Sequence, residues 1–245
     1  MKKLISYFKI HQRFLLNKIN IIILFVVELF LIVITCTNIF SLNKKYSVFY
    51  SDEAINEYIG NIIIIVKLII IPLLCYIWGN AFNKENDSYH LLCNSYFKTR
   101  LPYLILKLLF LMVVNIIVIG VYYVVTTIIG ILFSNWYRYA NNLIGLYGAL
   151  FLIILIYNLI SVMFSVLIPS NYAYFLPIVL LVLGEILSDN LDELLIIKIY
   201  QLFVPTFTME APYIKFGISS AIILICILTI IVVCLYVNYR REPKL

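Results

Sequence analysis

The sequence predicts an all-α integral membrane protein with six transmembrane helices, and three observations lead to this prediction. Of the 245 residues, 64% are apolar and only 12% are charged, whereas soluble domains carry about 25% charged residues. Six long apolar stretches fill most of the chain, and about 20 such residues cross a bilayer core as a helix. The basic residues gather at one set of ends of these stretches, as they do in membrane proteins.

We expect one membrane domain covering residues 1–245 and no separate soluble domain. The predicted spans are 19–40, 59–82, 101–133, 143–168, 172–187 and 214–239. The third stretch is too long for a simple crossing, so its start is expected to run along or out of the membrane. Residues 1–18 alternate basic and apolar side chains, which predicts an amphipathic helix on the inner leaflet. A fraying cytosolic tail is the alternative.

The charge distribution orients the predicted bundle. With the N-terminus inside, the inner segments 1–18, 83–100, 169–171 and 239–245 hold eleven Lys or Arg and three Asp or Glu. The outer segments 41–58, 134–142 and 188–213 hold four Lys or Arg and seven Asp or Glu. This asymmetry predicts that both termini lie in the cytoplasm. We expect the membrane to be a bacterial cell membrane. The asymmetry also accounts for the net charge of +6 without a nucleic-acid partner.

The sequence lacks most signatures of catalysis. Its eight glycines are scattered, so no Gly-rich phosphate loop is present and any ATP would be bound by another chain. Neither His11 nor His90 lies in a predicted span, which disfavours intramembrane Ser/His or zinc proteases. The five cysteines have no CxxC spacing and lie mostly in apolar runs, so we interpret them as buried hydrophobes, with no metal site expected.

Glu28, Lys67 and Glu185 are charged residues inside predicted spans, where charge is costly and usually functional or paired. Glu28 lies about nine residues from the inner face and Lys67 about eight from the outer face, which gives depths of about 13 and 12 Å at 1.5 Å per residue. We predict that they pair, either to fix helix register or to line a substrate route. Glu185 is expected to reach the outer interface, and Asn115 and Asn158 to form interhelical hydrogen bonds.

The order of these elements resembles the permease subunits of type-2 ATP-binding-cassette exporters. The resemblance covers the whole chain as architecture, and residues 85–107 carry its most specific part. There Glu85, a Leu91-Leu92 pair, Arg100 and Lys107 match the acidic residue, Leu pair and basic residues that follow the family's second span. The match is partial, because Ser88-Tyr89 stands where the family often has Gly-Thr, and no proline follows before Pro102.

The resemblance implies a cytosolic coupling helix in segment 84–97 that docks on an ATPase subunit. Exposed apolar groups in a polar segment need such a partner, although the helix could instead pack back on the membrane surface. The residues assigned to this contact are Glu85, Tyr89, Leu91, Leu92, Tyr96 and Phe97. The resemblance also implies an outer re-entrant helical segment at 188–213, in which Asp189, Asp192 and Glu193 would cap helix N-termini.

The expected assembly is two permease copies, identical or sister chains, with two ATPase subunits that hold ATP and magnesium. The expected substrates are amphipathic peptides, as for the related lantibiotic-immunity permeases and staphylococcal phenol-soluble-modulin exporters. Two alternatives from other classes remain open. One is the membrane capture subunit of a vitamin importer, which usually lacks such a coupling segment. The other is a membrane sensor or scaffold with no transport.

Overall fold

The structure of the chain is a computed structural model, which describes residues 18–46, 51–83, 100–139, 143–168, 172–191, 229–233 and 236–237. These residues are helical apart from the short connections between helices, and no strand occurs among them. The elements in chain order are α2 (Lys18–Lys45), α3 (Ser51–Ile65), η1 (Val66–Ile70), α4 (Ile71–Phe82), α6 (Arg100–Phe133), η3 (Trp136–Tyr139), α7 (Leu143–Leu167), η4 (Ala173–Phe175) and α8 (Leu176–Leu191).

Four helical stretches in the described residues are long and apolar enough to cross a membrane. They cover Asn20–Lys45, Asp52–Phe82, Pro102–Phe133 and Leu143–Leu167, and they coincide with the first four predicted spans. The fifth predicted span corresponds to η4 and α8, which contain a shorter apolar helix at Ala173–Leu183. Most of the predicted sixth span, 214–239, lies outside the described residues. The all-α membrane class is therefore confirmed, and the count of six spans stays a prediction.

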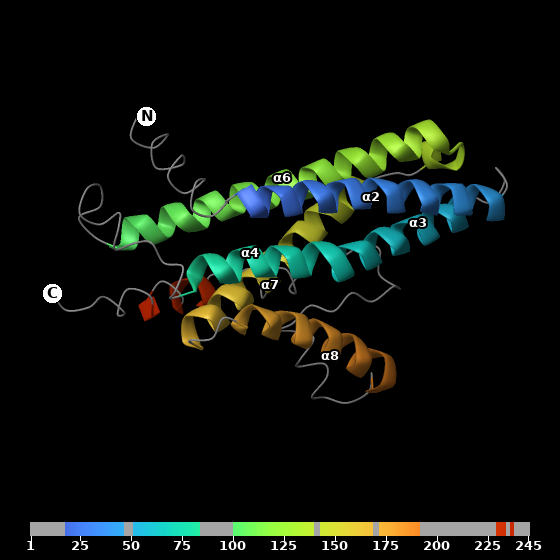
Figure 1. The fold of residues 1–245 in the computed structure, drawn as a ribbon. Coiled ribbons are helices and arrows are strands. Elements are labelled where there is room, and N and C mark those ends of the chain that lie inside the picture. Colours follow the sequence, from blue (N-terminus) through green and yellow to red (C-terminus); the bar gives the residue numbers. More distant parts are fainter. Residues whose placement is uncertain are drawn as a thin grey trace.

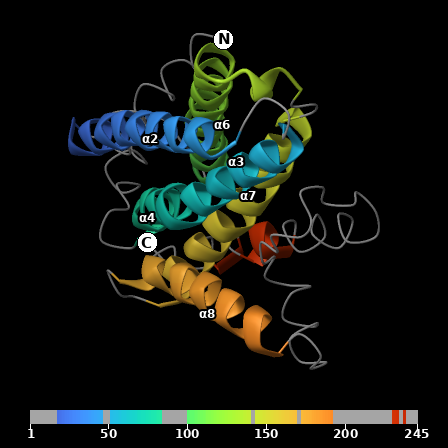
Figure 2. The ribbon, with the colours of Figure 1, turned by 90° about the vertical axis from the view of Figure 1, so that its right-hand side faces the viewer.

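The long helices form a bundle in which α2, α6 and the α3–α4 stretch lie side by side (Figure 1). Helix α7 crosses behind this group and packs against α4 and α6, while α8 covers α7 and α4 on the far side (Figure 2). Helix α2 is the most peripheral of the four, since it packs mainly on α6 and more lightly on α3. The core consequently lies among α4, α6 and α7.

Two helix boundaries differ from the sequence prediction. The segment 41–58 is predicted as a loop, yet α2 continues to Lys45 and α3 begins at Ser51, so the connection is confined to 46–50. Helix α6 has no break over its 34 residues, which correspond to about 51 Å at 1.5 Å per residue. This exceeds a hydrocarbon core of about 30 Å. The excess length therefore favours a start that projects out of the membrane over one that lies along it.

The second span is one helix with an irregular centre. Between α3 and α4 the chain forms the π-helix η1, in which the backbone N–H of Ile71 donates to the carbonyl oxygen of Val66. Pro72, in the first turn of α4, supplies the cause. It has no N–H for the carbonyl of Leu68, and its ring would crowd that carbonyl in a regular α-helix. Widening the turn accommodates the ring, and such π-helical turns are frequent at functional sites.

The closest helix contact joins α4 to α7 and η4 at Gly79. A Cβ atom built on this glycine would lie 2.5 Å from Tyr174 Cβ, 2.6 Å from Ser161 Oγ and 2.9 Å from Ser165 Oγ. The hydroxyl of Ser161 uses this proximity to donate to the carbonyl oxygen of Cys75 over 2.7 Å. Small and hydroxylated residues allow membrane helices to approach closely and to bond across their interface. Gly79 therefore sets the distance between α4 and α7.

We expect Gly79→Ala to lower the free energy of unfolding by about 1–3 kcal/mol, because the added methyl group overpacks the α4–α7 contact. Gly148→Ala on α7 is the matched control, since a Cβ there meets nothing within 4 Å and alanine favours the helix. Thermal unfolding of both variants in the same detergent would measure the difference. Equal unfolding temperatures would contradict the importance of this contact.

Candidate functional site

The interior of the described bundle holds several polar side chains at the depth of the apolar spans. Because lipid cannot satisfy such groups, they mark positions where a membrane protein bonds across helices or handles a polar substrate. The buried polar residues in the described spans include Thr35, Lys67, Lys107, Asn115, Thr126, Asn158, Ser161 and Ser165. They lie on α2, η1, α6 and α7. Glu28 adds a half-buried carboxylate on α2.

Glu28 and Tyr122 lie at the contact between α2 and α6. Oε2 of Glu28 is buried and has no hydrogen-bond partner within the structure as described. The carboxylate lies within electrostatic range of the hydroxyl of Tyr122. That hydroxyl lies within reach of Thr35, whose own hydroxyl donates to the carbonyl oxygen of Leu31 over 2.7 Å and can still accept. The α2–α6 contact thus contains a carboxylate oxygen with unused bonding capacity.

The ion pair proposed between Glu28 and Lys67 stays a prediction. Among the described residues a salt bridge joins Lys45 to Glu57, with Nζ 2.7 Å from Oε2. Helix α2 packs on α6 and on α3 of the second span, and Glu28 lies within electrostatic range of Tyr122 of α6. Lys67 lies in η1, at the centre of the second span.

Lys67 lies at the centre of the second span, within the π-helix η1, and only 8% of its surface is exposed. Its neighbour Leu68 is 68% exposed, so the two residues face opposite sides of the helix. The widened turn therefore places a long basic side chain inside the bundle rather than toward the surrounding medium. Since π-turns shift the register of a helix, this orientation was not predictable from a 3.6-residue period.

A second cation is buried at the end of α4, where the chain leads into segment 84–99. The ammonium group of Lys107 lies over the ring of Phe82 at 4.9 Å and over that of Tyr103 at 5.3 Å from the ring centroids. Cation–π contacts of desolvated groups contribute about 2 kcal/mol. Lys107 thus ties the last residue of α4 to α6, immediately before the segment predicted to dock on an ATPase.

Three helices share one hydrogen-bond acceptor in the middle of the bundle. Trp78 of α4 donates its indole N–H to Oδ1 of Asn115 of α6 over 2.9 Å, and Nδ2 of Asn158 of α7 donates to the same oxygen over 3.2 Å. All three side chains have no exposed surface. The prediction that Asn115 and Asn158 bond helices together is confirmed, whereas no sequence pattern indicated the role of Trp78.

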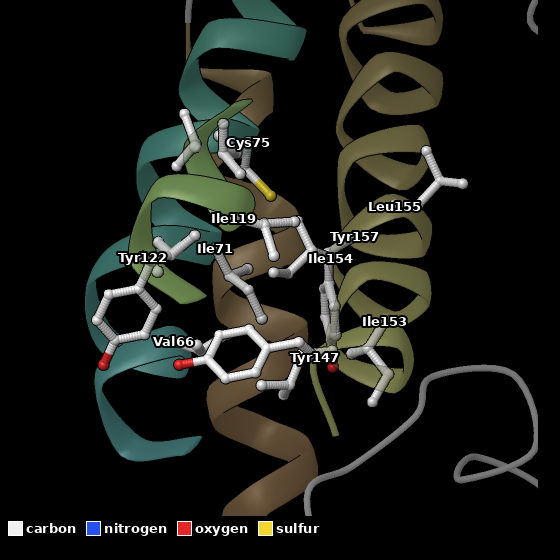
Figure 3. Close-up of a cluster of buried hydrophobic side chains, with 14 of the residues drawn as sticks. Val66, Ile71, Cys75, Ile119, Tyr122, Tyr147, Ile153, Ile154, Leu155 and Tyr157 are labelled. Carbon is white, nitrogen blue, oxygen red and sulfur yellow. The ribbon is translucent and has the colours of Figure 1, made fainter. Parts of the chain in front are cut away.

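A polar aromatic cluster lies at the end of the described bundle where α3 and α7 begin. The hydroxyl of Tyr58 donates to the carbonyl oxygen of Thr126 over 2.8 Å, and the hydroxyl groups of Thr126 and Tyr147 share a hydrogen bond. Tyr122 lies beside Tyr147 with its ring centroid 6.1 Å away, and the hydroxyl end of Tyr147 points toward Tyr122 (Figure 3). These bonds join α3, α6 and α7 at one level.

The aromatic connection after α6 packs inward. Trp136 and Tyr137 are buried, and both rings meet Tyr58 edge-on, at 5.5 and 5.8 Å. The indole N–H of Trp136 donates to Oδ1 of Asn43 over 2.8 Å, while Nδ2 of Asn43 donates to the carbonyl oxygen of Phe133. One asparagine therefore joins the ends of α2 and α6, a contact no sequence pattern indicated.

Several predicted site residues lie outside the part of the chain that the structure describes. These are the coupling residues Glu85, Tyr89, Leu91, Leu92, Tyr96 and Phe97, the outer residues Asp192 and Glu193, and the interfacial segment 1–17. Asp189 belongs to the last turn of α8, which continues to Leu191. A capping role at the start of an outer helix would therefore fall to Asp192 and Glu193.

Comparisons with known proteins identify no relative of this chain. No family model, no curated protein and no solved structure matches the sequence or the fold. The described residues contain no group of three or more His, Cys, Asp or Glu side chains placed to hold a metal ion. The function must therefore be argued from the arrangement of the helices and their buried polar groups.

We expect Glu28→Gln to raise the free energy of unfolding by about 1 kcal/mol, because an unpartnered buried charge is costlier than an unpartnered buried amide. Glu57→Gln is the matched control. Its carboxylate binds Lys45 and the hydroxyl of Tyr46 at the protein surface, so its loss should lower stability slightly or not at all. Thermal unfolding at neutral pH measures both changes. A marked loss of stability in the Glu28 variant would show that its carboxylate is satisfied.

Proposed function

We propose that this protein is the membrane subunit of an ATP-driven exporter of the type-2 ATP-binding-cassette class. It would work as a pair of permease copies, identical or sister chains, with two ATPase subunits that bind ATP and magnesium. The proposed cargo is an amphipathic peptide, antimicrobial or cytolytic. The six-span topology with both termini in the cytoplasm of a bacterial cell membrane is part of the proposal, and the distribution of basic residues supports it.

The observation that carries the proposal is the irregular centre of the second span. The π-helix η1 divides this span into α3 and α4, and α4 leads directly into segment 84–97. Transporters use interrupted helices and hinges to switch between inward- and outward-open states. A force applied to segment 84–97 by an ATPase would act along α4, and the widened turn at η1 is the point where α4 would pivot relative to α3.

The buried polar groups favour a transporter over a passive scaffold. A scaffold gains nothing from a carboxylate oxygen left without a partner in a membrane, since such a group lowers stability. Glu28 fits a route whose polar groups bind the cargo during transport. The carboxylate of Glu28 would attract the basic residues on the polar face of an amphipathic peptide, while the apolar face remains against the lipid.

We expect Lys67→Met to fold with a normal yield and to reduce peptide-stimulated ATP hydrolysis by about tenfold or more, equivalent to about 1.4 kcal/mol of activation free energy. The change keeps the length of the side chain and removes a charge from the pivot of the second span. Leu68→Met, on the exposed side of the same turn, is the matched control and should hydrolyse ATP normally. Full activity of the Lys67 variant would remove this residue from the mechanism.

We expect alanine at Leu91, Leu92 and Tyr96 together to abolish co-purification with the ATPase subunit. These side chains supply the apolar surface of the proposed docking helix. The test co-expresses the full chain with the ATPase encoded beside it and measures the recovered ratio of the two proteins. Alanine at Tyr172 and Phe175, in the exposed turn before α8, is the control and should leave the ratio unchanged. Undiminished association of the triple variant would refute the docking assignment.

A further inference from the structure

The hydrogen bonds among Trp78, Asn115 and Asn158 have a fixed direction. An indole N–H can only donate, so Asn115 must present Oδ1 to Trp78 at 2.9 Å. With Oδ1 in that position, Asn158 can meet it only through Nδ2, as it does at 3.2 Å. Turning either amide over would bring two donors or two acceptors together. Trp78 of α4 therefore determines which way the hydrogen bond between α6 and α7 runs.

This direction leaves two buried atoms without partners. Nδ2 of Asn115 and Oδ1 of Asn158 have no hydrogen-bond partner in the structure as described, although both residues are fully buried. One atom is a donor and the other is an acceptor, and they belong to two residues that are already joined. The opposite direction, from Nδ2 of Asn115 to Oδ1 of Asn158, would use these two atoms. The pair therefore has two arrangements, and Trp78 selects one of them.

The surroundings transmit the position of α4 to this pair. Cys75 on α4, Ile119 on α6 and Ile154 on α7, each about one helical turn along its helix from Trp78, Asn115 and Asn158 respectively, belong to the same buried apolar cluster (Figure 3). Such a close-packed layer transmits movement of one helix to its neighbours. At the same level Gly79 holds α4 against α7. A shift of α4 would thus move the indole of Trp78 relative to Asn115.

We infer that Trp78 is a positioning residue that sets the direction of the Asn115–Asn158 hydrogen bond, so that the position of α4 controls the bonding between α6 and α7. With the indole in place the bond runs from Asn158 to Asn115, and with the indole withdrawn the reverse direction becomes accessible as well. The role of this reversal in transport rests on the proposed function, in which the ATPase moves α4. The dependence of the bond's direction on Trp78 does not rest on the proposed function.

The test observes the side-chain amides of the full-length protein by NMR, with ¹⁵N-labelled asparagine. Signals are assigned with Asn115→Leu and Asn158→Leu. In the unmodified protein, the amide protons of Asn158 should lie downfield as hydrogen-bonded groups, and those of Asn115 upfield. In Trp78→Phe the two should partly exchange character, because Asn115 can then also be the donor. Unchanged signals for both amides in the Trp78 variant would overturn the inference.

Two further variants keep this test decisive. Benzothienylalanine at position 78 replaces the indole N–H by sulfur with little change of shape, so it removes the donor even where Trp78→Phe folds poorly, and it should give the same exchange of signals. Trp136→Phe breaks the other tryptophan–asparagine bond, to Asn43, and should leave the signals of Asn115 and Asn158 in place. Perturbation of the pair by Trp136→Phe equal to that by the Trp78 changes would refute a specific role for Trp78.

The NMR test of the bond's direction and the test of the proposed function can give independent results. The amide signals report the direction of the bond whether or not the protein exports peptides. Peptide-stimulated ATP hydrolysis is measured on the same variants in lipid discs with the ATPase subunit, and Trp78→Phe should reduce it while ATPase association persists. Reversed amides without any ATP-driven transport by the unmodified protein would refute the exporter and leave the role of Trp78 intact.

Discussion

The close approach of α4 to α7 at Gly79 is the contact on which the packing of α4, α6 and α7 depends. Because no side chain separates the helices there, Ser161 reaches the carbonyl of Cys75. The same proximity brings Trp78 to the level of Asn158, so that both can bond to Asn115 of α6. In a bilayer the hydrophobic effect gives little drive for helix association, so close packing and these hydrogen bonds must supply the specificity.

The two ends of the described bundle are held by different chemistry. At the end of the bundle where α4 finishes, the contacts are a missing side chain, a buried hydroxyl and a lysine over two aromatic rings. At the end where α3 begins, Tyr58 bonds α3 to α6, and Asn43 bonds α2 to α6 and to the η3 turn. Between these ends lies η1, where Pro72 prevents regular helical bonding. Two firmly bonded ends with an irregular centre are the arrangement expected of a helix that pivots.

The sequence predicted the four long described spans well because they depend only on local apolar content. The errors arise where tertiary contacts decide. The π-helix could not be predicted from a regular period, and the inward packing of Trp136 depends on an acceptor, Asn43, that lies 93 residues away. Equal depth is the basis for predicting a Glu28–Lys67 pair, yet depth does not specify which side chains meet. The electrostatic contact of Glu28 with Tyr122 of α6 was not indicated by depth or by local pattern.

The unpartnered atoms of the interior argue for a protein with more than one state. A bundle selected only for stability would pair or replace the Glu28 carboxylate, since exchange for an apolar residue would remove a cost. Retaining it is understandable when a second arrangement of the helices, or a bound cargo, supplies the missing partner. The same reasoning applies to Asn115 and Asn158, whose free donor and acceptor match each other. The stability given up in one state is then recovered in the next, which is how binding energy can drive a conformational cycle.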